Sequence, residues 1–164
     1  MTNLAPCTEL RNRAERPDRI IRPLGRGSDA VVLELLHRQD GWSRNPAIHQ
    51  MMQDRMLPSA PPPAAWAAGL FVANELTGVV RAGAASLQAH IEAALFVDEE
   101  WRRQGIGSML LEETMGWARR AEASALRFIC DRADWPMRHF AEKFGARLDL
   151  VFGQIVADIN LVKQ

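Results

Sequence analysis

One stretch of the sequence most restricts how this chain can fold. In it, an apolar segment is followed by a glycine-bearing turn and then by a long amphipathic helix. Residues 89–97 have the apolar character of a strand, and residues 102–107 interrupt that pattern. Residues 108–123 then repeat apolar side chains at helical spacing. The side chains expected to face inward are Leu110, Leu111, Thr114, Met115, Ala118 and Ala121. The segment therefore predicts a strand, a turn and a helix in direct succession.

Short connections between the other segments predict the rest of the topology. The expected strands are residues 20–24, 66–73, 79–86, 89–97, 126–131, 147–152 and 154–161. Besides the helix over 108–123, helices are expected after Ser28, after Pro46 and after the cap residue Asp134. The second, third and fourth strands follow one another with short links, so they should pair as an antiparallel meander. Pro23 should confine the first strand to a sheet edge or end it.

The chain has the length of one domain. Its 164 residues contain no visible repeat, and residues 1–18 are polar and unpatterned. We therefore expect a loose N-terminal extension over 1–18 and a single domain over 19–164. The 20 basic and 20 acidic side chains cancel, whereas proteins that bind nucleic acid or anionic membranes show a basic excess. No run of about 18 apolar residues is present, so we expect no membrane span.

Cysteine and lysine usage indicate the cellular setting. Cys7 and Cys130 are far apart and form neither a disulfide framework nor a zinc-ligand spacing. We therefore expect no metal and a reducing compartment, the cytoplasm. Lysine occurs only at Lys143 and Lys163, beside many arginines and alanines, which is typical of a GC-rich, bacterial genome.

The turn before the long helix has the chemistry of an anion site. The first N–H groups of a helix have no intrahelical partner, and the helix dipole places positive charge there. Gly105 and Gly107 would let the backbone come close to an anion, and Arg102 and Arg103 add charge. A tight strand-to-helix turn explains both glycines as well, so both interpretations stay open on loop chemistry alone. Neither a dinucleotide fingerprint nor a Walker A loop is present.

Two short motifs resemble the GNAT superfamily of N-acetyltransferases. Arg102-x-x-Gly105-x-Gly107, after a strand that ends in Val97, resembles the acyl-CoA loop of that superfamily, usually written Gln/Arg-x-x-Gly-x-Gly/Ala. Residues 134–146 resemble its second signature, in which Asn or Asp starts a helix and an aromatic-Tyr pair precedes a Gly-Phe end. The order of the expected strands and helices also matches.

The resemblance implies an α+β fold of GNAT type: a mixed, mostly antiparallel sheet of six or seven strands with helices on both faces. It implies acetyl-CoA as the acyl-donor cosubstrate, with a pantetheine arm that lies like a strand where the fourth and fifth strands splay apart. The backbone of Leu95, Phe96 and Val97 would hold that arm, and Asp134 and Phe140 would contact the arm and its thiol end. The residues implied for the pyrophosphate loop are Arg102, Arg103, Gln104, Gly105, Ile106, Gly107 and Ser108.

One departure from the superfamily pattern concerns the general acid. Ala141 stands where many members have the tyrosine that protonates the departing thiolate, and this chain contains no tyrosine. Cys130, His139 or a water could supply the proton instead. The thiolate could also leave unaided, because the thiolate of CoA is a tolerable leaving group near neutral pH.

The other departure concerns the general base. Counting back from the loop without gaps places Ile91 at the position of the glutamate that members often have, with Glu92 one residue later. Successive strand side chains point to opposite faces, so Glu92 reaches the site only if a β-bulge shifts the register. Such a bulge is a feature of the superfamily, which keeps Glu92 as the catalytic candidate, with His90 on the same face. A solvated or salt-bridged glutamate is the alternative.

The resemblance predicts an enzyme, an N-acyltransferase that moves an acetyl group from acetyl-CoA to an amine by direct attack in a ternary complex. The missing tyrosine and displaced glutamate motivate an alternative, a catalytically silent GNAT-like module that binds CoA as a sensor or partner domain. A third interpretation is a plain anion- or nucleotide-binding domain with an accidental likeness. Small amines, amino acids, antibiotics and protein N-termini all stay open as acceptors. Relatives often pair through sheet edges or final strands, which leaves a homodimer open.

Overall fold

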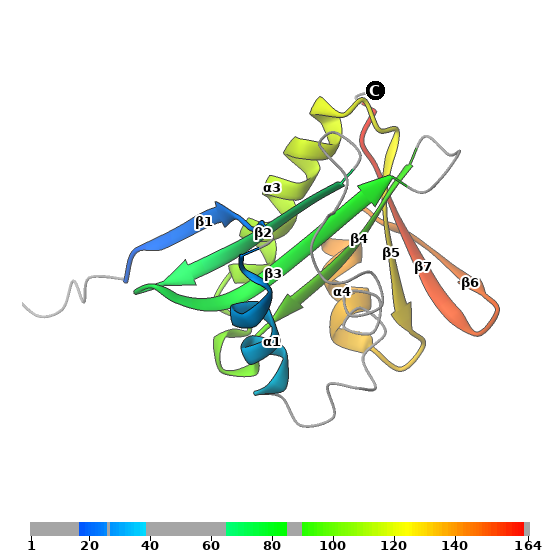
Figure 1. Cartoon of the computed structure of the whole chain (residues 1–164). Coiled ribbons are helices and arrows are strands. Elements are labelled where there is room, and N and C mark those ends of the chain that lie inside the picture. Colours follow the sequence, from blue (N-terminus) through cyan, green and yellow to red (C-terminus); the bar gives the residue numbers. More distant parts are fainter. Residues whose placement is uncertain (1–16, 26, 39–64, 85–89, 163–164) are drawn as a thin grey trace, which may run out of the picture.

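The computed structural model describes residues 17–25, 27–38, 65–84 and 90–162, which are built on a seven-stranded β-sheet of order β1-β2-β3-β4-β5-β7-β6 (Figure 1). The strands are β1 (Arg19–Pro23), β2 (Ala65–Val72), β3 (Glu75–Ala84), β4 (His90–Val97), β5 (Ala125–Asp131), β6 (Arg147–Val151) and β7 (Gln154–Asn160). The helices are α1 (Asp29–His37), α3 (Ile106–Arg120) and α4 (Trp135–Lys143), with a short 3₁₀ helix, η2 (Glu99–Trp101). In this part of the chain, no helix is long and apolar enough to cross a membrane.

The meander β2-β3-β4 forms the antiparallel half of the sheet, as the short connections predict. β3 pairs with β4 in one unbroken register, from Gly78 opposite Val97 to Ala84 opposite Ile91. β1 adds to β2 at the edge of the sheet, and Pro23, which has no N–H to donate, is its last residue. The expected edge position of the first strand is therefore confirmed.

β4 and β5 pair in parallel, and their pairing stops early. The pairs are His90 with Ala125, Ile91 with Leu126, and Glu92 with Arg127. Beyond these, β4 continues beside β3 to Val97, and β5 continues beside β7 to Asp131. Figure 1 shows the two strands diverging toward their C-terminal ends. The facing edges of the diverging segments carry backbone N–H and C=O groups that pair with none of the described strands, and such groups need another partner.

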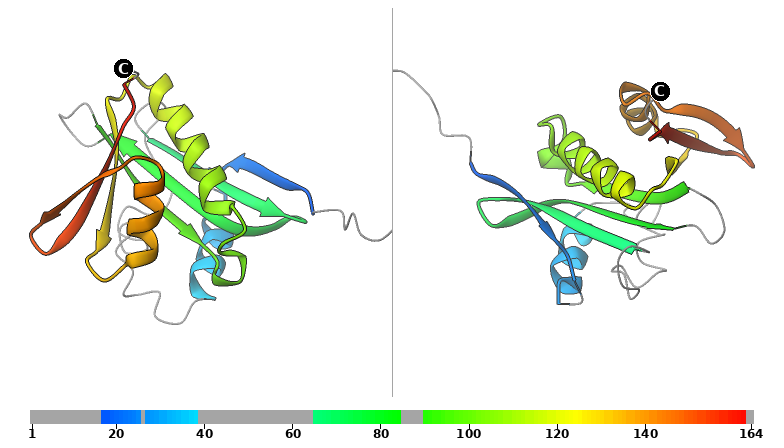
Figure 2. Two further views of the ribbon diagram at one scale, coloured as in Figure 1. Left: turned by 180° about the vertical axis from the view of Figure 1, so that it is seen from behind. Right: turned by 90° about the horizontal axis from the view of Figure 1, so that it is seen from above.

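Helices cover both faces of the sheet (Figure 2). α3 lies on one face, where its buried residues are Ile106, Leu110, Leu111, Thr114, Trp117 and Ala118. α4 lies on the same face, because Ala141 and Phe140 share a cluster with Leu111 of α3 and with Phe128 of β5. On the other face, α1 packs Val32, Leu35 and Leu36 against Val79, Ala94 and Phe96. The expected α+β fold, with a sheet of six or seven strands and helices on both faces, is therefore confirmed, and the sheet has seven strands.

The helix ends agree with the sequence in most details. The long helix begins at Ile106, two residues before the predicted start, and Gly105 is its N-cap residue. Asp134 caps α4 as predicted, since its carboxylate accepts a hydrogen bond from the N–H of Met137 at 3.0 Å. The helix predicted after Pro46 and most of the predicted loose extension lie outside the described residues.

The close approach of β3 and α3 at Gly78 makes a prediction about stability. A Cβ at Gly78 would lie 2.9 Å from Cγ2 of Ile106 and 3.2 Å from the carbonyl oxygen of Phe96. Gly78→Ala should therefore lower the free energy of unfolding by about 1–3 kcal/mol, measured by urea denaturation. Gly25→Ala is the control, because no atom of the described residues lies within 4 Å of the added Cβ there. An unchanged unfolding free energy for Gly78→Ala would contradict this packing.

Candidate functional site

Beyond the last β4–β5 pair, Glu92 with Arg127, the two strands leave a gap between them. The end of β4, the first turn of α3 and α4 meet at the open end of this gap. An added Cβ at Gly107, in the first turn of α3, would lie 3.5 Å from ring carbons of Phe140 on α4. The same Cβ would lie 3.6 Å from Cγ2 of Val97 at the end of β4. The first-turn N–H groups of α3 have no intrahelical acceptor, and no side chain among the described residues caps this helix at Gly105. The mouth of the gap therefore carries uncapped backbone donors in the positive field of a helix N-terminus.

The loop between η2 and α3 turns tightly and uses two residues with positive φ. Arg103 has φ of 60° and Gly105 has φ of 85°. Residues with a Cβ adopt this left-handed region at a cost in strain, which Arg103 bears and glycine at 105 avoids. At Gly107, by contrast, a Cβ would make only ordinary van der Waals contacts within the protein. Gly105 therefore shapes the loop, whereas Gly107 keeps space open beside Val97 and Phe140.

Side chains hold this loop from several directions. The Arg102 Nε donates to the carbonyl oxygen of Val97 at 3.1 Å, and the Gln104 Nε2 donates to the carbonyl oxygen of Glu100 at 3.1 Å. Arg19, on the distant edge strand β1, donates to the carbonyl oxygen of Gln104. The loop is thus fixed both to the end of β4 and to the far edge of the sheet.

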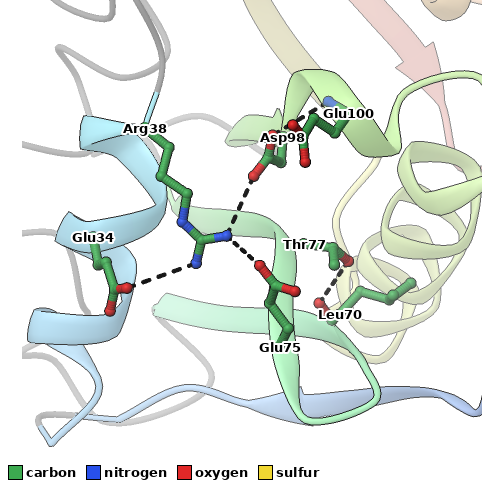
Figure 3. A network of polar contacts seen from close by, with 7 residues as sticks. All are labelled: Glu34, Arg38, Leu70, Glu75, Thr77, Asp98 and Glu100. Carbon is green, nitrogen blue, oxygen red and sulfur yellow. Dashed lines mark hydrogen bonds and ion pairs between the residues drawn. The ribbon is translucent and has the colours of Figure 1, made fainter.

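A buried carboxylate, Asp98, fixes the start of the same loop (Figure 3). Asp98 is 4% exposed, and its N–H donates to the carbonyl oxygen of Thr77 at 2.9 Å. Its carboxylate accepts the N–H of Glu100 at 3.3 Å and so caps η2. Arg38, just after α1, lies 3.5 Å from the Asp98 carboxylate and also pairs with Glu75. Arg38 therefore ties α1 to the turn that leads into the loop.

The structure brings most of the predicted cofactor residues to this open end. Leu95 and Val97 of β4 lie on the α3 face, whereas the side chain of Phe96 is buried on the α1 face. Phe140 lies beside Gly107, and the Asp134 carboxylate is engaged in capping α4. The end of β4, the first turn of α3 and Phe140 of α4 therefore lie next to one another. Of the three β4 residues, only Phe96 therefore has its side chain on the other face.

Glu92 lies on the face of the sheet opposite α3. The pairing of β4 with β3 has no bulge from Ile91 to Val97, so the bulge expected in this strand is wrong for these residues. Ile91 is buried under α3. The Glu92 side chain is 34% exposed, and its Oε1 lies 3.8 Å from Nε2 of His90. Glu92 nevertheless belongs to the last β4–β5 pair, where the gap begins.

A row of alternating charges crosses the sheet at Glu92. The strand registers place Glu92, Arg127, Asp158 and Arg147 side by side on β4, β5, β7 and β6. Arg127 donates to both carboxylate oxygens of Asp158, at 2.7 and 2.9 Å. These hydrogen bonds hold the pKa of Asp158 below its ordinary value and raise the pKa of Arg127. The Arg127 guanidinium is therefore committed to Asp158 rather than to Glu92.

The candidates for a general acid are placed unfavourably. Burial, with the nearby Asp134 carboxylate adding to it, raises the pKa of Cys130 to about 11, so this thiol is a poor proton donor near neutral pH. His139 lies on the exposed side of α4, with Nδ1 3.0 Å from the carbonyl oxygen of Trp135. Ala141 is buried in the core. Over the described ranges, no group of three or more His, Cys, Asp or Glu side chains could hold a metal ion.

Sequence reasoning missed the two arginines that hold the loop, Arg19 and Arg38. Arg19 is 85 residues from Gln104 in the chain, and no motif or spacing connects them. Only the placement of β1 at the sheet edge and of α1 beside β3 brings these guanidinium groups to the loop.

Comparison with known proteins gives one family and one fold. Residues 31–146 match the acetyltransferase (GNAT) family, and no curated protein matches. The PaiA N-acetyltransferase of Thermoplasma acidophilum, solved in complex with coenzyme A, superposes with a TM-score of 0.72 at 16% identity over 87% of this chain and 99% of its own. The GNAT domain of S. lividans PAT superposes with a TM-score of 0.71 at 13% identity, and the match covers 92% of this chain and 99% of that one. The Escherichia coli ribosomal-protein-S18-alanine N-acetyltransferase superposes with a TM-score of 0.68 at 12% identity, and the match covers 90% of this chain and 96% of that one.

The Arg38 contacts predict an effect on stability. Arg38→Ala leaves the buried Asp98 carboxylate without this cation, so the free energy of unfolding should fall by about 1–3 kcal/mol. Arg120→Ala removes an exposed pair with Glu113 and should cost less than about 0.5 kcal/mol. Urea denaturation measures both variants. Equal losses in the two would contradict a fixing role for Arg38.

The lowered pKa of Asp158 predicts a dependence of stability on pH. A carboxylate whose pKa is lowered by folding stabilises the folded state above its ordinary pKa of about 4, and that contribution disappears as the pH falls through the lowered value. Asp158→Asn should therefore lower the free energy of unfolding by about 1 kcal/mol at pH 7, and by progressively less as the pH falls below ~4. Asp149→Asn, which removes an exposed pair with Arg147, should cost less at pH 7. A constant cost of Asp158→Asn from pH 7 to 2 would contradict the assignment.

Proposed function

The chain belongs to the acetyltransferase (GNAT) family, and on that premise we propose that it transfers an acetyl group from acetyl-CoA to an amine of an acceptor. The transfer would be a direct attack in a ternary complex of enzyme, donor and acceptor. Family membership also removes the interpretation in which the likeness of the two motifs is accidental.

The early end of the β4–β5 pairing, with the first turn of α3 at its mouth, carries this proposal. An extended pantetheine arm contains amide groups, so it can pair with the backbone groups of β4 that lack a strand partner. The pyrophosphate would then meet the first-turn N–H groups of α3, where an anion is favoured. The residues proposed to bind the donor are those at this open end, from Leu95 to Val97 and from Arg102 to Ser108, with Asp134 and Phe140 beyond it.

In the proposed reaction, most of the rate enhancement comes from positioning the donor and the amine. The amine nitrogen attacks the thioester carbonyl carbon, a backbone N–H near Val97 polarises the carbonyl oxygen, and the C–S bond then breaks. The departing CoA thiolate takes its proton from water, because the Cys130 thiol has too high a pKa to be a good donor. Because no β-bulge turns Glu92 toward α3, the acceptor is proposed to enter from the opposite face of the sheet, where Glu92 at the start of the gap would accept the proton of the amine through a water.

A catalytically silent CoA-binding module is the second candidate function. The observations that favour it are the buried Ile91 at the family's glutamate position and the buried Ala141 at its tyrosine position. Release of free thiol from acetyl-CoA in the presence of primary amines, amino acids and peptide N-termini distinguishes the two functions. Steady release with any of these acceptors supports the enzyme, whereas binding of CoA without turnover across the panel supports the module.

Donor binding makes a prediction for Gly107. CoA at a hundred times its dissociation constant should stabilise the wild type by about 2.7 kcal/mol, a melting shift of several degrees. Gly107→Trp should abolish that shift, because its side chain would fill the space beside Val97 and Phe140. Gly116→Trp is the control on the same helix, since an added Cβ there meets only the flexible end of Arg120. No shift of the wild type with CoA, or a larger shift with ATP, would contradict the proposed site.

Glu92 makes a prediction for catalysis. If turnover is observed with an amine, Glu92→Gln should lower kcat at least about tenfold, since a base in such reactions contributes by that much or more. Glu113→Gln, on the exposed side of α3, is the control and should leave kcat unchanged. Equal kcat values for wild type and Glu92→Gln would assign the glutamate to the solvated sheet face instead.

A further inference from the structure

We propose that Arg19, on the edge strand β1, is a positioning residue for donor binding: it holds the carbonyl group of Gln104 so that the next N–H faces the pyrophosphate of CoA. This inference rests on the proposed function. It concerns a residue that lies outside the stretch matched by the family, which begins at residue 31.

The contact joins the outermost strand of the sheet to the loop at its centre. Nη1 of Arg19 donates to the carbonyl oxygen of Gln104 and lies 3.9 Å from the place of a Cβ on Gly105. Ile21, two residues along β1 and therefore on the same face, packs in the cluster of Ile106 and Leu110. β1 is thus held against the first turns of α3, and its arginine reaches the residue before the helix cap.

Peptide geometry turns this contact into an effect on the anion site. In a trans peptide the C=O and the following N–H point in opposite directions. Fixing the carbonyl of Gln104 toward Arg19 therefore directs the N–H of Gly105 away from β1. Gly105 is the N-cap residue, and its N–H is among those that the helix leaves without an intrahelical acceptor. A carbonyl turned the other way would present partial negative charge to the pyrophosphate.

Charge and burial agree with this role. Glu99 and Glu100 are exposed just before the loop and offset the charges of Arg102 and Arg103, so a further cation strengthens the field at the loop. Nε of Arg19 is buried and makes no hydrogen bond with the described residues. An unsatisfied buried N–H costs free energy, and the hydrogen bond from Nη1 to the loop is the contact that offsets this cost. The placement therefore fits a group kept for the loop rather than for the strand.

Arg22 provides a matched control on the same strand. It is three residues from Arg19 and therefore lies on the opposite face of β1. Its guanidinium lies over the Phe71 ring at 5.1 Å, and its Nη2 is 3.4 Å from Oδ1 of Asn74. Arg22→Ala thus removes the same charge from the same strand without touching the loop.

The test is isothermal titration of CoA and of pantetheine, which lacks the phosphates, into wild type, Arg19→Ala, Arg19→Lys and Arg22→Ala. Arg19→Ala should weaken CoA binding about tenfold, as expected for loss of one charge-assisted hydrogen bond, and leave pantetheine binding unchanged. Arg19→Lys should recover part of the loss, and Arg22→Ala should bind both ligands as the wild type does. All four proteins should melt within a few degrees of one another without ligand.

Three results would overturn the inference while leaving the proposed function in place. They are equal CoA affinity for Arg19→Ala and wild type, an equal loss in Arg22→Ala, and a parallel loss of pantetheine affinity that indicates a generally disordered loop. A wild type that binds no CoA would overturn the proposed function itself, and this inference with it.

Discussion

The fold depends on the point at which β4 and β5 stop pairing. Each strand keeps its other partner along its length, β4 with β3 and β5 with β7, so the two halves of the sheet separate after Glu92 and Arg127 without losing their own ladders. Backbone groups along the separating edges need partners, and a buried edge without them would be costly. The first turn of α3 and Phe140 of α4 stand at the mouth of this gap. The same separation that would weaken an ordinary sheet leaves the backbone edges that we propose an extended amide-bearing ligand with an anionic end would occupy.

Local sequence patterns predicted the parts of this arrangement that depend on local physics. The apolar spacing of α3, the Asp134 cap and the glycine-bearing loop are written in consecutive residues, and the structure has each of them. The resemblance to a known family supplied the splay of the two strands but placed a bulge in β4 that is absent beside β3. Register and face are decided by neighbouring strands, so the position of Glu92 opposite α3 could not be read from β4 alone. The contacts of Arg19 with Gln104 and of Arg38 with Asp98 depend on the packing of β1 and α1, which no short motif encodes.

The chemistry that fits this site is one in which binding and orientation supply most of the rate. A thioester is already activated, and the thiolate of CoA needs little help to leave, so a chain with Ala141 in place of a tyrosine can still carry out the transfer. Such a site does require that the acyl donor be held in one position. The loop is held at its start by Asp98, at its middle by Arg102 on the carbonyl of Val97, and at its end by Arg19 on the carbonyl of Gln104. Arg19 on β1, and Arg38 just after α1 through its pair with Asp98, thus connect these N-terminal elements to the proposed donor loop, although neither element borders the gap.

Hydrogen–deuterium exchange of the amides with and without CoA tests the central claim most directly, because it reports where the ligand occupies backbone donors. The account predicts slower exchange on CoA addition at the end of β4, over residues 93–97, and in the loop and first turn of α3, over residues 103–108. It predicts no change in the β6–β7 hairpin, which lies beyond β5 on the far side of the gap. Protection confined to other segments, or unchanged exchange in both predicted segments under saturating CoA, would contradict the assignment of the gap as the donor site.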